Sequence, residues 1–501
     1  MRRFTRFLIN GIMLTGVSLI FQLAENVFTI YISSKIGESS VGLFGLVMSV
    51  YRFGVTLSLS GISLAATRRV AERLAEKNYI GVKKLSLKAL VLSILFGSIV
   101  FLVLFLASPI LGSGILKSRE TISSLKILSV SLPFLAASSA ISGYFIAVRK
   151  PIKNVIGSAG AFIVRIACTV ILLSVLPWGL ESSILSLSFG TTAGEIAGFI
   201  ITFILFLKDR NNYSSYGNDV KKSGKEILSV AMPVALSSYV RSALYTLEQL
   251  FIPSSLIRYG ESRTEALGNY GMIKGMVLPV LITPSVLMYS FSGLLVPELA
   301  EAQKLGDKRK SEKITSYVFY LSFIYSVAVC GLIFFYADSL SMYLFKSSEP
   351  AFYLKALAPL TIVMYLDGAV DNILKGLGEQ LYCMRVNIAD AALSLISVLI
   401  LVPRMGINGY VFVILLSEMV NTFLSVWKLL KITSLKINLS RFLIIPVFFI
   451  LSACCFSKLL CIVFPSLNFF IGIAVAVTVY LILSLCFSEF RQTKRSSLDL
   501  F

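Results

Sequence analysis

Long apolar runs follow one another along almost the whole of this 501-residue chain. Each run is roughly 20 residues or longer, enough for an α-helix to cross a hydrocarbon core of about 30 Å. Lipid offers no hydrogen bonds, so a spanning helix satisfies its own backbone, and the period-2 alternation of a β-barrel is absent. We predict an all-α polytopic membrane protein with fourteen transmembrane helices, at about 7–33, 41–64, 86–108, 122–148, 154–176, 183–207, 227–257, 268–296, 314–337, 356–379, 384–402, 407–430, 439–463 and 467–489.

The basic residues indicate the topology. The net charge is +20, and charged residues make up only 14% of the chain. By our count, 32 of the 46 Lys and Arg residues fall at the termini and in alternate loops on the same side, which is the cytoplasmic pattern. We therefore interpret the positive charge as a topology signal, not as a nucleic-acid surface. The expected location is the cytoplasmic membrane, with both termini in the cytoplasm.

The sequence lacks the residues that several kinds of catalytic and metal site require. The chain has no histidine, which excludes His-based metal sites and Ser-His-Asp triads. The seven cysteines have no CxxC spacing, and no GxxxxGK[ST] motif for ATP is present. We expect no cofactor, no metal centre and no enzymatic activity. Transport energy would come from an ion gradient, the membrane potential or the substrate gradient.

The first and second blocks of six expected spans resemble each other. Glu25 precedes Glu248 by 223 residues, and Glu195 precedes Glu418 by the same interval. Six spans is an even number, so both halves would enter from the same side, and folds of this kind place a substrate site between their halves. We predict an N-terminal lobe over 1–210, a C-terminal lobe over 211–432, and two accessory helices within 433–501.

Eleven ionisable residues lie inside the expected spans. At roughly 2.5–3.5 kcal/mol each, facing lipid would cost about 30 kcal/mol in total. They must therefore face a watery cavity or pair within the bundle. The set is Glu25, Arg52, Arg165, Glu195, Arg241, Glu248, Lys274, Asp367, Asp371, Asp390 and Glu418.

Four of these residues are candidate substrate-binding cations. The repeat aligns Arg52 on the second span with Lys274 on the eighth, so each half offers a cation at the same place. Arg241 shares a helix face with Glu248, because the two stand at i and i+7. Arg165 is the fourth candidate. The alternative for each is a structural ion pair.

The acidic residues divide into two groups. Glu25 and Glu248, matched between the halves, are assigned to gating or cation coupling. Asp367, Asp371 and Asp390 would form a cation or proton site, or else neutralise nearby bases. Asp371 can also pair with Lys375, one helical turn away. Two further acids, Glu195 and Glu418, are interpreted as structural hydrogen-bond acceptors within their own lobes.

Two basic loops contain many helix-forming residues. They are Thr67–Lys84 and Val296–Lys313. Each is expected to form an amphipathic helix at the cytoplasmic interface or an ordinary solvated connector.

The opening of the chain resembles a known family. A first span ending in Gly37–Gly42–Leu43 precedes a Gly61–Ala65 stretch and a basic Ala71–Glu76 loop, AERLAE. These motifs, and the run from Met405, resemble the stage V sporulation protein B and polysaccharide-transporter branch of the multidrug/oligosaccharidyl-lipid/polysaccharide (MOP) exporter superfamily. The resemblance covers essentially the whole chain.

That resemblance implies the MOP flippase fold, with two six-helix lobes around a cavity and two extra helices. It also implies alternating access that moves an undecaprenyl-pyrophosphate-linked sugar, for example a peptidoglycan precursor, in polysaccharide, cell-wall or sporulation pathways. In related lipid II flippases, cations on spans one, two and eight line the cavity. Arg52 and Lys274 match on spans two and eight, whereas span one has no cation, and Arg241 on span seven would substitute.

Our hypothesis is a monomeric flippase that carries a lipid-linked oligosaccharide from the cytoplasmic to the outer leaflet. Its partners would be the lipid-linked sugar, membrane lipid, and Na⁺ or H⁺, with no nucleic acid. A cation-coupled multidrug exporter on the same fold is the alternative, favoured by the acids of the C-terminal lobe. A membrane glycosyltransferase or ligase is disfavoured, because the outer loops around 109–121 and 338–355 are short.

Overall fold

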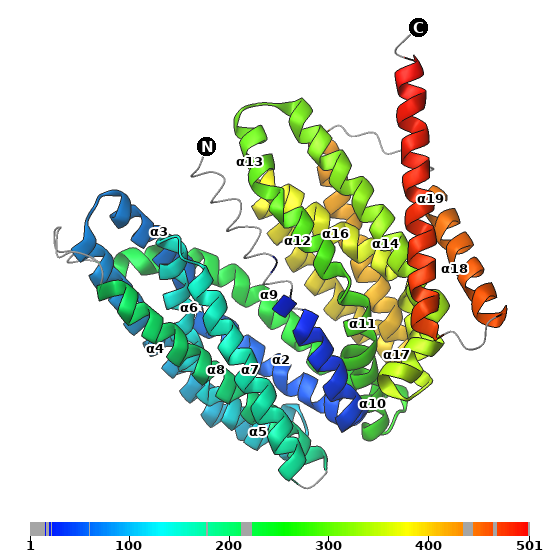
Figure 1. The fold of residues 1–501 in the computed structure, drawn as a ribbon. Helices are drawn as coiled ribbons and strands as arrows, with labels where there is room; N and C mark the ends of the chain where they lie inside the picture. Colours follow the sequence, from blue (N-terminus) through cyan, green and yellow to red (C-terminus); the bar gives the residue numbers. More distant parts are fainter. Residues whose placement is uncertain are drawn as a thin grey trace. The chain divides into compact units, whose positions relative to one another are not determined.

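The computed structural model describes residues 16, 20–21, 23–59, 61–176, 179–211, 223–433, 444–463 and 468–498, and this part is helical without strands. Figure 1 shows the helices. Those of the first half are α2 (Glu38–Leu59), α3 (Ile62–Ala75), α4 (Tyr79–Pro109), η1 (Ile110–Ile115), α5 (Glu120–Val130), α6 (Leu132–Ala147), α7 (Ile152–Val175) and α8 (Leu180–Asn211), after a helix over 23–36. Those of the second half are α9 (Ser223–Tyr259), α10 (Arg263–Gly271), η2 (Met272–Val277), α11 (Leu278–Ile282), α12 (Ser285–Leu294), α13 (Val296–Lys304), α14 (Lys308–Phe345), α15 (Glu349–Leu357), α16 (Leu360–Gly376), α17 (Gln380–Thr433), α18 (Ile445–Val463) and α19 (Phe469–Leu498).

The helices confirm an all-α membrane fold. Seven helices of the described chain are long and apolar enough to cross a membrane, or nine if each bent pair forms one span. The 54-residue α17 covers two expected spans and is interrupted at Gly406, which has a non-helical backbone. The start of the first expected span, at residues 7–15, lies outside the described residues. The number fourteen therefore stays a prediction.

The chain divides into two compact units. Unit 1 contains Lys35–Met272 and Ala391–Tyr410, together with the N-terminal residues up to Phe21. Unit 2 contains Gln22–Ser34, Ile273–Asp390 and Val411–Phe501. These units follow contacts, whereas the expected lobes, 1–210 and 211–432, follow the repeat. The lobes stay a prediction from the repeat, and each unit is described by itself below.

The backbone carries the same repeat as the sequence. Left-handed residues, which end helices, recur at an interval of 229 residues in three pairs: Lys77 and Gly306, Lys117 and Lys346, and Arg149 and Gly378. Elements recur with them, because α5 and α15 begin 229 residues apart. Each half thus has a short helix, a tight turn, a long helix and then an interrupted helix. The repeat is therefore structural as well as sequential.

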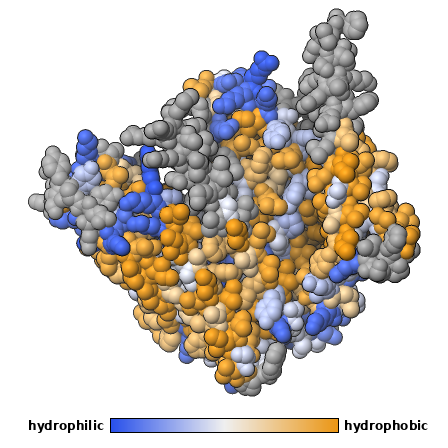
Figure 2. Space-filling model, viewed as in Figure 1, coloured by the Kyte–Doolittle hydropathy of each residue, from blue (hydrophilic) through white to orange (hydrophobic). Residues whose placement is uncertain are grey.

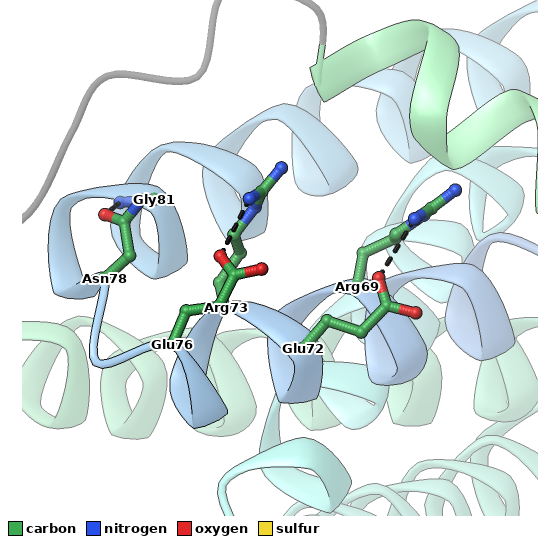
Figure 3. Close-up of polar contacts among 6 residues, drawn as sticks. All are labelled: Arg69, Glu72, Arg73, Glu76, Asn78 and Gly81. Carbon is green, nitrogen blue, oxygen red and sulfur yellow. Dashed lines mark hydrogen bonds and ion pairs between the residues drawn. The ribbon is translucent and has the colours of Figure 1, made fainter.

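Side-chain caps set the start of the long helix in each half. Asn78 Oδ1 accepts a hydrogen bond of 2.8 Å from the Gly81 amide at the start of α4 (Figure 3). Asp307 Oδ1 accepts one of 2.9 Å from the Lys310 amide at the start of α14. Each cap satisfies an amide that the first helical turn leaves without a partner.

Those caps also decide the structure of the two basic loops. Neither loop is one amphipathic helix, because α3 ends at Ala75 and α4 begins at Tyr79, with Lys77 in the left-handed region between them. The same division separates α13 from α14 at Gly306. On α3, Arg69 pairs with Glu72 and Arg73 pairs with Glu76, each at 2.9 Å (Figure 3).

Prolines coincide with bends in the broken helices. The pair Arg263–Ile282 and Ser285–Gly293 is bent by 52°, and Pro284 lies at the break. The pair Glu349–Leu357 and Leu360–Gly376 is also bent by 52°, with Pro359 at its break. A proline lacks the amide that would continue the helix, so the chain turns there.

Glycines bring pairs of helices close together. α7 and α8 run side by side in unit 1 (Figure 1), and a Cβ on Gly194 would lie 2.7 Å from the Ala161 carbonyl oxygen. α2 crosses α10 more closely: a Cβ on Gly42 would lie 2.1 Å from the Leu267 carbonyl oxygen. Such close backbone approach is how helices associate in lipid, where no hydrophobic force drives them together.

In each half, an ion pair, here called a tie, joins the end of a long helix to another segment of the same half. In unit 1, buried Asp209 at the end of α8 receives Lys150 Nζ at 2.6 Å and Lys153 Nζ at 2.7 Å. In unit 2, Lys428 near the end of α17 meets Glu379 at 3.2 Å, in the turn before that helix. The two ties join equivalent segments with the signs of the charges exchanged.

Apolar side chains cover much of the surface. Figure 2 shows a broad hydrophobic area where α4, α7 and α8 lie, while hydrophilic residues gather near α3. The exposed residues include Val103 on α4, Ile171 on α7 and Ile204 on α8. A soluble protein does not expose patches of this extent, so these helices face lipid.

Candidate functional site

Two of the expected cations lie along one seam between packed helices of unit 1. Arg52 on α2 and Arg241 on α9 are both exposed. Ser242, next to Arg241, donates a 3.1 Å hydrogen bond to Thr56, one turn after Arg52. Neither guanidinium forms an ion pair within the part of the chain that the structure describes. The seam therefore presents two arginines in positions where an anion can reach them.

Glu248 lies further along α9 and is held by the first arm of α17. Ser394 donates a 2.7 Å hydrogen bond to Glu248 Oε1. The neighbouring Gln249 is buried and accepts a 2.9 Å hydrogen bond from Tyr270 on α10. Glu248 and Arg52 both act electrostatically on that tyrosine hydroxyl. The structure thus groups Arg52, Arg241 and Glu248 on the polar side of α2 and α9.

Lys274 and Glu25 belong to unit 2. Lys274 lies in η2, the π-helical part of a broken span. Next to it, the Gly275 carbonyl accepts a 2.8 Å hydrogen bond from Ser33, on the helix that also carries exposed Glu25. π-Helical segments are rare and are frequently found at functional sites. Nothing in the residue pattern around Lys274 indicates this irregularity.

The acids of unit 2 form one cluster. α16 contributes Asp367 and Asp371, and the two arms of α17 contribute Asp390 and Glu418. All four are half-buried. Asp367 and Asp390 both act electrostatically on Glu418. Tyr289 on α12 lies in the field of the same cluster, and its ring packs directly on Gly368, which has no side chain to exclude it.

Neutral polar groups surround these carboxyls. Asn421 donates a 3.0 Å hydrogen bond to Asp367 Oδ2, and Ser417 donates one of 2.5 Å to Asp390 Oδ1. Within the described part of the chain, Lys375 is the cation that pairs in the cluster, at 3.4 Å from Asp371 Oδ2. Four carboxyls with one lysine leave an excess of negative charge at membrane depth, which is costly unless a proton or a cation balances it.

Two buried oxygens in the cluster lack a hydrogen-bond donor. They are Asp367 Oδ1 and Asn421 Oδ1, one on each side of the bond between these residues. An unsatisfied buried acceptor is expensive and calls for an explanation, such as an ion or a proton that occupies the site in another state. Within the described residues, no three Asp, Glu, Cys or His side chains converge as ligands of one metal ion. A bound cation would therefore also draw on amide or hydroxyl oxygens.

The remaining expected residues lie elsewhere. Arg165 on α7 places its guanidinium over the Phe162 ring, 5.4 Å from the centroid. Glu195 on α8 acts on the buried Tyr51 hydroxyl, which shares a 2.6 Å hydrogen bond with Ser131. The repeat mates Glu195 and Glu418 thus have different surroundings, because Glu418 joins the acidic cluster.

The neutral residues around the charged side chains were not predicted from the sequence. Asn421, Ser417 and Tyr289 complete the acidic cluster, and Thr56 and Ser242 connect the arginine seam. Serine, threonine and tyrosine are common in membrane helices, so their presence gives no signal. Only the i, i+3 spacing of Glu418 and Asn421 would have pointed to a shared helix face.

Comparison with known proteins places this arrangement in a class. An inward closed conformation of the lipid II flippase MurJ matches with a TM-score of 0.73 over 95% of this chain and 99% of that one, at 13% identity. An inward-facing multidrug resistance MATE family transporter of the MOP superfamily matches with a TM-score of 0.66 over 82% and 94%, at 14% identity. The fold is therefore that of the polytopic helical transporters of this superfamily.

The family follows from the sequence comparison. Residues 7–303 match the polysaccharide biosynthesis protein family, and the chain belongs to this family. Stage V sporulation protein B of Bacillus subtilis is 24% identical over 445 residues, which cover 87% of this chain and 86% of that protein. The chain is thus a multi-pass membrane transporter homologue, and its family and structural neighbours are transporters and flippases.

Proposed function

We propose that this protein flips an undecaprenyl-pyrophosphate-linked oligosaccharide or peptidoglycan precursor from the cytoplasmic to the outer leaflet. The observation that carries the proposal is the arginine seam, where exposed Arg52 and Arg241 lie on packed helices without an ion pair in the described chain. A pyrophosphate carries at least two negative charges, and arginine binds such groups through paired, charge-assisted hydrogen bonds. The lipid II flippase MurJ, which shares the fold, handles a substrate of this class.

The two lobes predicted from the repeat would open alternately to the two sides of the cytoplasmic membrane. In this scheme Lys274 and Arg165 complete the cationic lining that Arg52 and Arg241 begin. Support for Lys274 is its place in the π-helical η2 of a bent span, where a small change of pitch moves the side chain. Both termini would lie in the cytoplasm, and one chain with membrane lipid around it would suffice.

Coupling would use the acids. Glu25 and Glu248, matched by the repeat, are the proposed gating pair. The cluster of Asp367, Asp371 and Asp390, joined by Glu418, would take up Na⁺ or H⁺ as the lobes move. The excess negative charge and the two acceptors without donors support this role.

A cation-coupled multidrug exporter is the second candidate. The acidic cluster of unit 2 favours it, since acids attract cationic drugs, and a MATE transporter shares the fold. The two functions differ in what the arginines do: a cationic drug gains nothing from Arg52, whereas a pyrophosphate depends on it.

The test is headgroup translocation in cells that require this protein for growth or polymer export. Arg52→Ala should lower translocation at least tenfold, because one charge-assisted, bidentate contact is lost. Arg52→Lys should retain an intermediate rate, because it keeps the positive charge but loses the planar guanidinium that forms two parallel hydrogen bonds. Arg258→Ala, which removes an arginine from the last turn of α9, is the matched control. Equal translocation by wild type and Arg52→Ala, at equal protein levels, would overturn the role of this residue.

A further inference from the structure

The second half contains an apolar groove on its unit 2 helices. Its volume is about 340 Å³, and it runs between α16 and the second arm of α17 in unit 2. Thr422 and Val426 of α17 line it together with Val363 of α16. The exposed rings of Phe423 and Trp427 form its wall. Its size falls within the roughly 300–1,000 Å³ typical of ligand pockets.

The internal repeat explains why the groove is open. Three phenylalanines fill the equivalent seam between α6 and α8. Phe134 and Phe199 lie 5.5 Å apart between ring centroids, and Phe199 stacks on Phe203 at 5.4 Å. The 229-residue interval of the turns pairs α6 with α16, and the 223-residue interval of the glutamates pairs α8 with the end of α17.

At the positions of the second half that are equivalent to these three rings, the intervals place smaller residues. Val363 replaces Phe134, Thr422 replaces Phe199, and Val426 replaces Phe203. The helices still meet at this seam, because Thr422 Oγ1 donates a 3.3 Å hydrogen bond to the Val363 carbonyl. The groove is therefore the space of three missing aromatic rings, not a gap between separated helices.

One end of the groove carries a positive charge. Lys431, in the last turn of α17, is exposed and has no acidic partner among the described residues. Its Nζ lies 5.4 Å from the centroid of the Trp427 ring. Lys428, by contrast, is engaged by Glu379 at 3.2 Å and by the Tyr382 ring. Tryptophan and lysine at a helix end are typical of the membrane interface, where a lysine reaches the head groups.

We propose that this groove binds an anionic phospholipid, with one acyl chain along Thr422 and Val426 and the phosphate at Lys431. The apolar lining fits a hydrocarbon chain, because a groove offers more van der Waals contacts to the chain than a convex protein surface does. The lysine at the helix end selects a negatively charged head group over a zwitterionic one. None of the residues that line the groove belongs to the arginine seam, so the lipid site does not depend on the proposed substrate.

Tryptophan fluorescence offers a direct test. The chain has two tryptophans, so Trp178→Phe leaves Trp427 as the only emitter in the full-length protein. This protein, purified in detergent, is titrated with phosphatidylglycerol or phosphatidylcholine brominated on the acyl chains. Saturable quenching by phosphatidylglycerol at a concentration at least fivefold lower than for phosphatidylcholine is expected.

Three variants in this background sharpen the result. Thr422→Phe/Val426→Phe restores two rings of the first half and should abolish saturable quenching. Val363→Phe fills the groove from α16 and serves if the double variant does not fold. Lys431→Ala should remove the preference for phosphatidylglycerol while quenching persists. The matched control is Val103→Phe on exposed α4, which adds the same ring outside the groove and should leave quenching unchanged.

Two outcomes overturn the proposal. The first is equal quenching by both lipids, unaffected by filling the groove, which means nonspecific micellar contact. The second is protection of Trp427 by undecaprenyl phosphate at lower concentration than by unbrominated phosphatidylglycerol. In that case the occupant is a polyprenyl lipid, and the assignment to a phospholipid is wrong.

Discussion

The proposed function depends on charged residues at membrane depth, and Asp367 is the most informative of them. One of its oxygens is bound by Asn421 at 3.0 Å, and the other is buried without a donor. Nearby Asp371 has Lys375, whereas Asp367 has no ion pair within the described chain. Unlike the Asp371 charge, the Asp367 charge therefore needs a proton or a cation from outside the described side chains.

Asp367→Asn should therefore uncouple transport from the ion gradient. The variant keeps the shape of the side chain and removes its charge, so the cluster has one negative charge fewer for a counterion to balance. Stimulation of headgroup translocation by an imposed Na⁺ or H⁺ gradient should fall at least tenfold. Asp338→Asn is the control, because Asp338 is exposed and pairs with Lys355 at 2.7 Å outside the cluster. Full gradient stimulation in Asp367→Asn would contradict the coupling role.

At this scale the sequence predicted the charges and missed their surroundings. An ionisable residue in an apolar run is costly, so all eleven could be found without coordinates. That Asp390 and Glu418 join Asp367, while Glu195 acts on Tyr51, depends on which helices meet. No spacing along the chain carries this information.

Close helix crossings limit how the elements can move. The crossing of α2 with α10 brings two backbones very close together, so it can be tested by substitution. A Cβ on Gly271 would lie 2.0 Å from the Glu38 carbonyl oxygen, which is backbone and cannot rotate away. Gly271→Ala must separate the helices, and overpacking of this kind costs about 1–3 kcal/mol. We expect a lower thermal midpoint in detergent.

Gly268→Ala on the same helix is the matched control. There the nearest atom to the new Cβ would be Ser39 Oγ, at an ordinary 3.7 Å. The added methyl group should leave the midpoint unchanged or raise it slightly, because alanine favours the helix. Equal midpoints for the two variants would show that the crossing is not close in the membrane.

The tie at Asp209 gives a second prediction for an element. Its carboxylate is 1% exposed and holds two lysines and the Tyr144 hydroxyl, which donates at 3.0 Å. Asp209→Asn leaves those donors without their shared charge and should destabilise the end of α8 by about 1–3 kcal/mol. Limited proteolysis within residues 212–222, compared with Lys153→Gln, measures the effect. Lys153→Gln should be milder because Lys150 remains, and equal cleavage of all three proteins would argue against the tie.

Element boundaries were predicted less well than elements. Apolar runs identified the spans, but the split of the basic loop into α3 and α4 depends on the left-handed Lys77 and the Asn78 cap. Lysine is an uncommon residue in that conformation, so composition favoured one continuous helix. Gly306 in the matching loop was the better signal, since glycine adopts positive φ without strain.

For the whole molecule, the repeat was the strongest information in the sequence. The interval between the glutamates predicted two related halves, and the recurring left-handed turns now support it in the backbone. The contact-based units nevertheless place α9 with the first half and parts of α17 in both units. A repeat reports on ancestry and topology, whereas contacts report on one packing state, so the two divisions differ.

The asymmetries between the halves matter as much as their likeness. The arginine seam of unit 1 and the acidic cluster of unit 2 carry opposite charge. An anionic substrate and a cationic coupling ion would then be handled by different parts of the chain. This division favours a coupled flippase over an exporter of cationic drugs.

The most direct test uses the purified protein in proteoliposomes that contain a fluorescent undecaprenyl-pyrophosphate-linked sugar. A membrane-impermeant reagent measures how much headgroup reaches the outer leaflet with time. We predict that wild type accelerates transfer well above the rate in protein-free vesicles and that Arg52→Ala abolishes most of this gain. Transfer at the protein-free rate by a folded wild-type protein, under every imposed ion gradient, would contradict it.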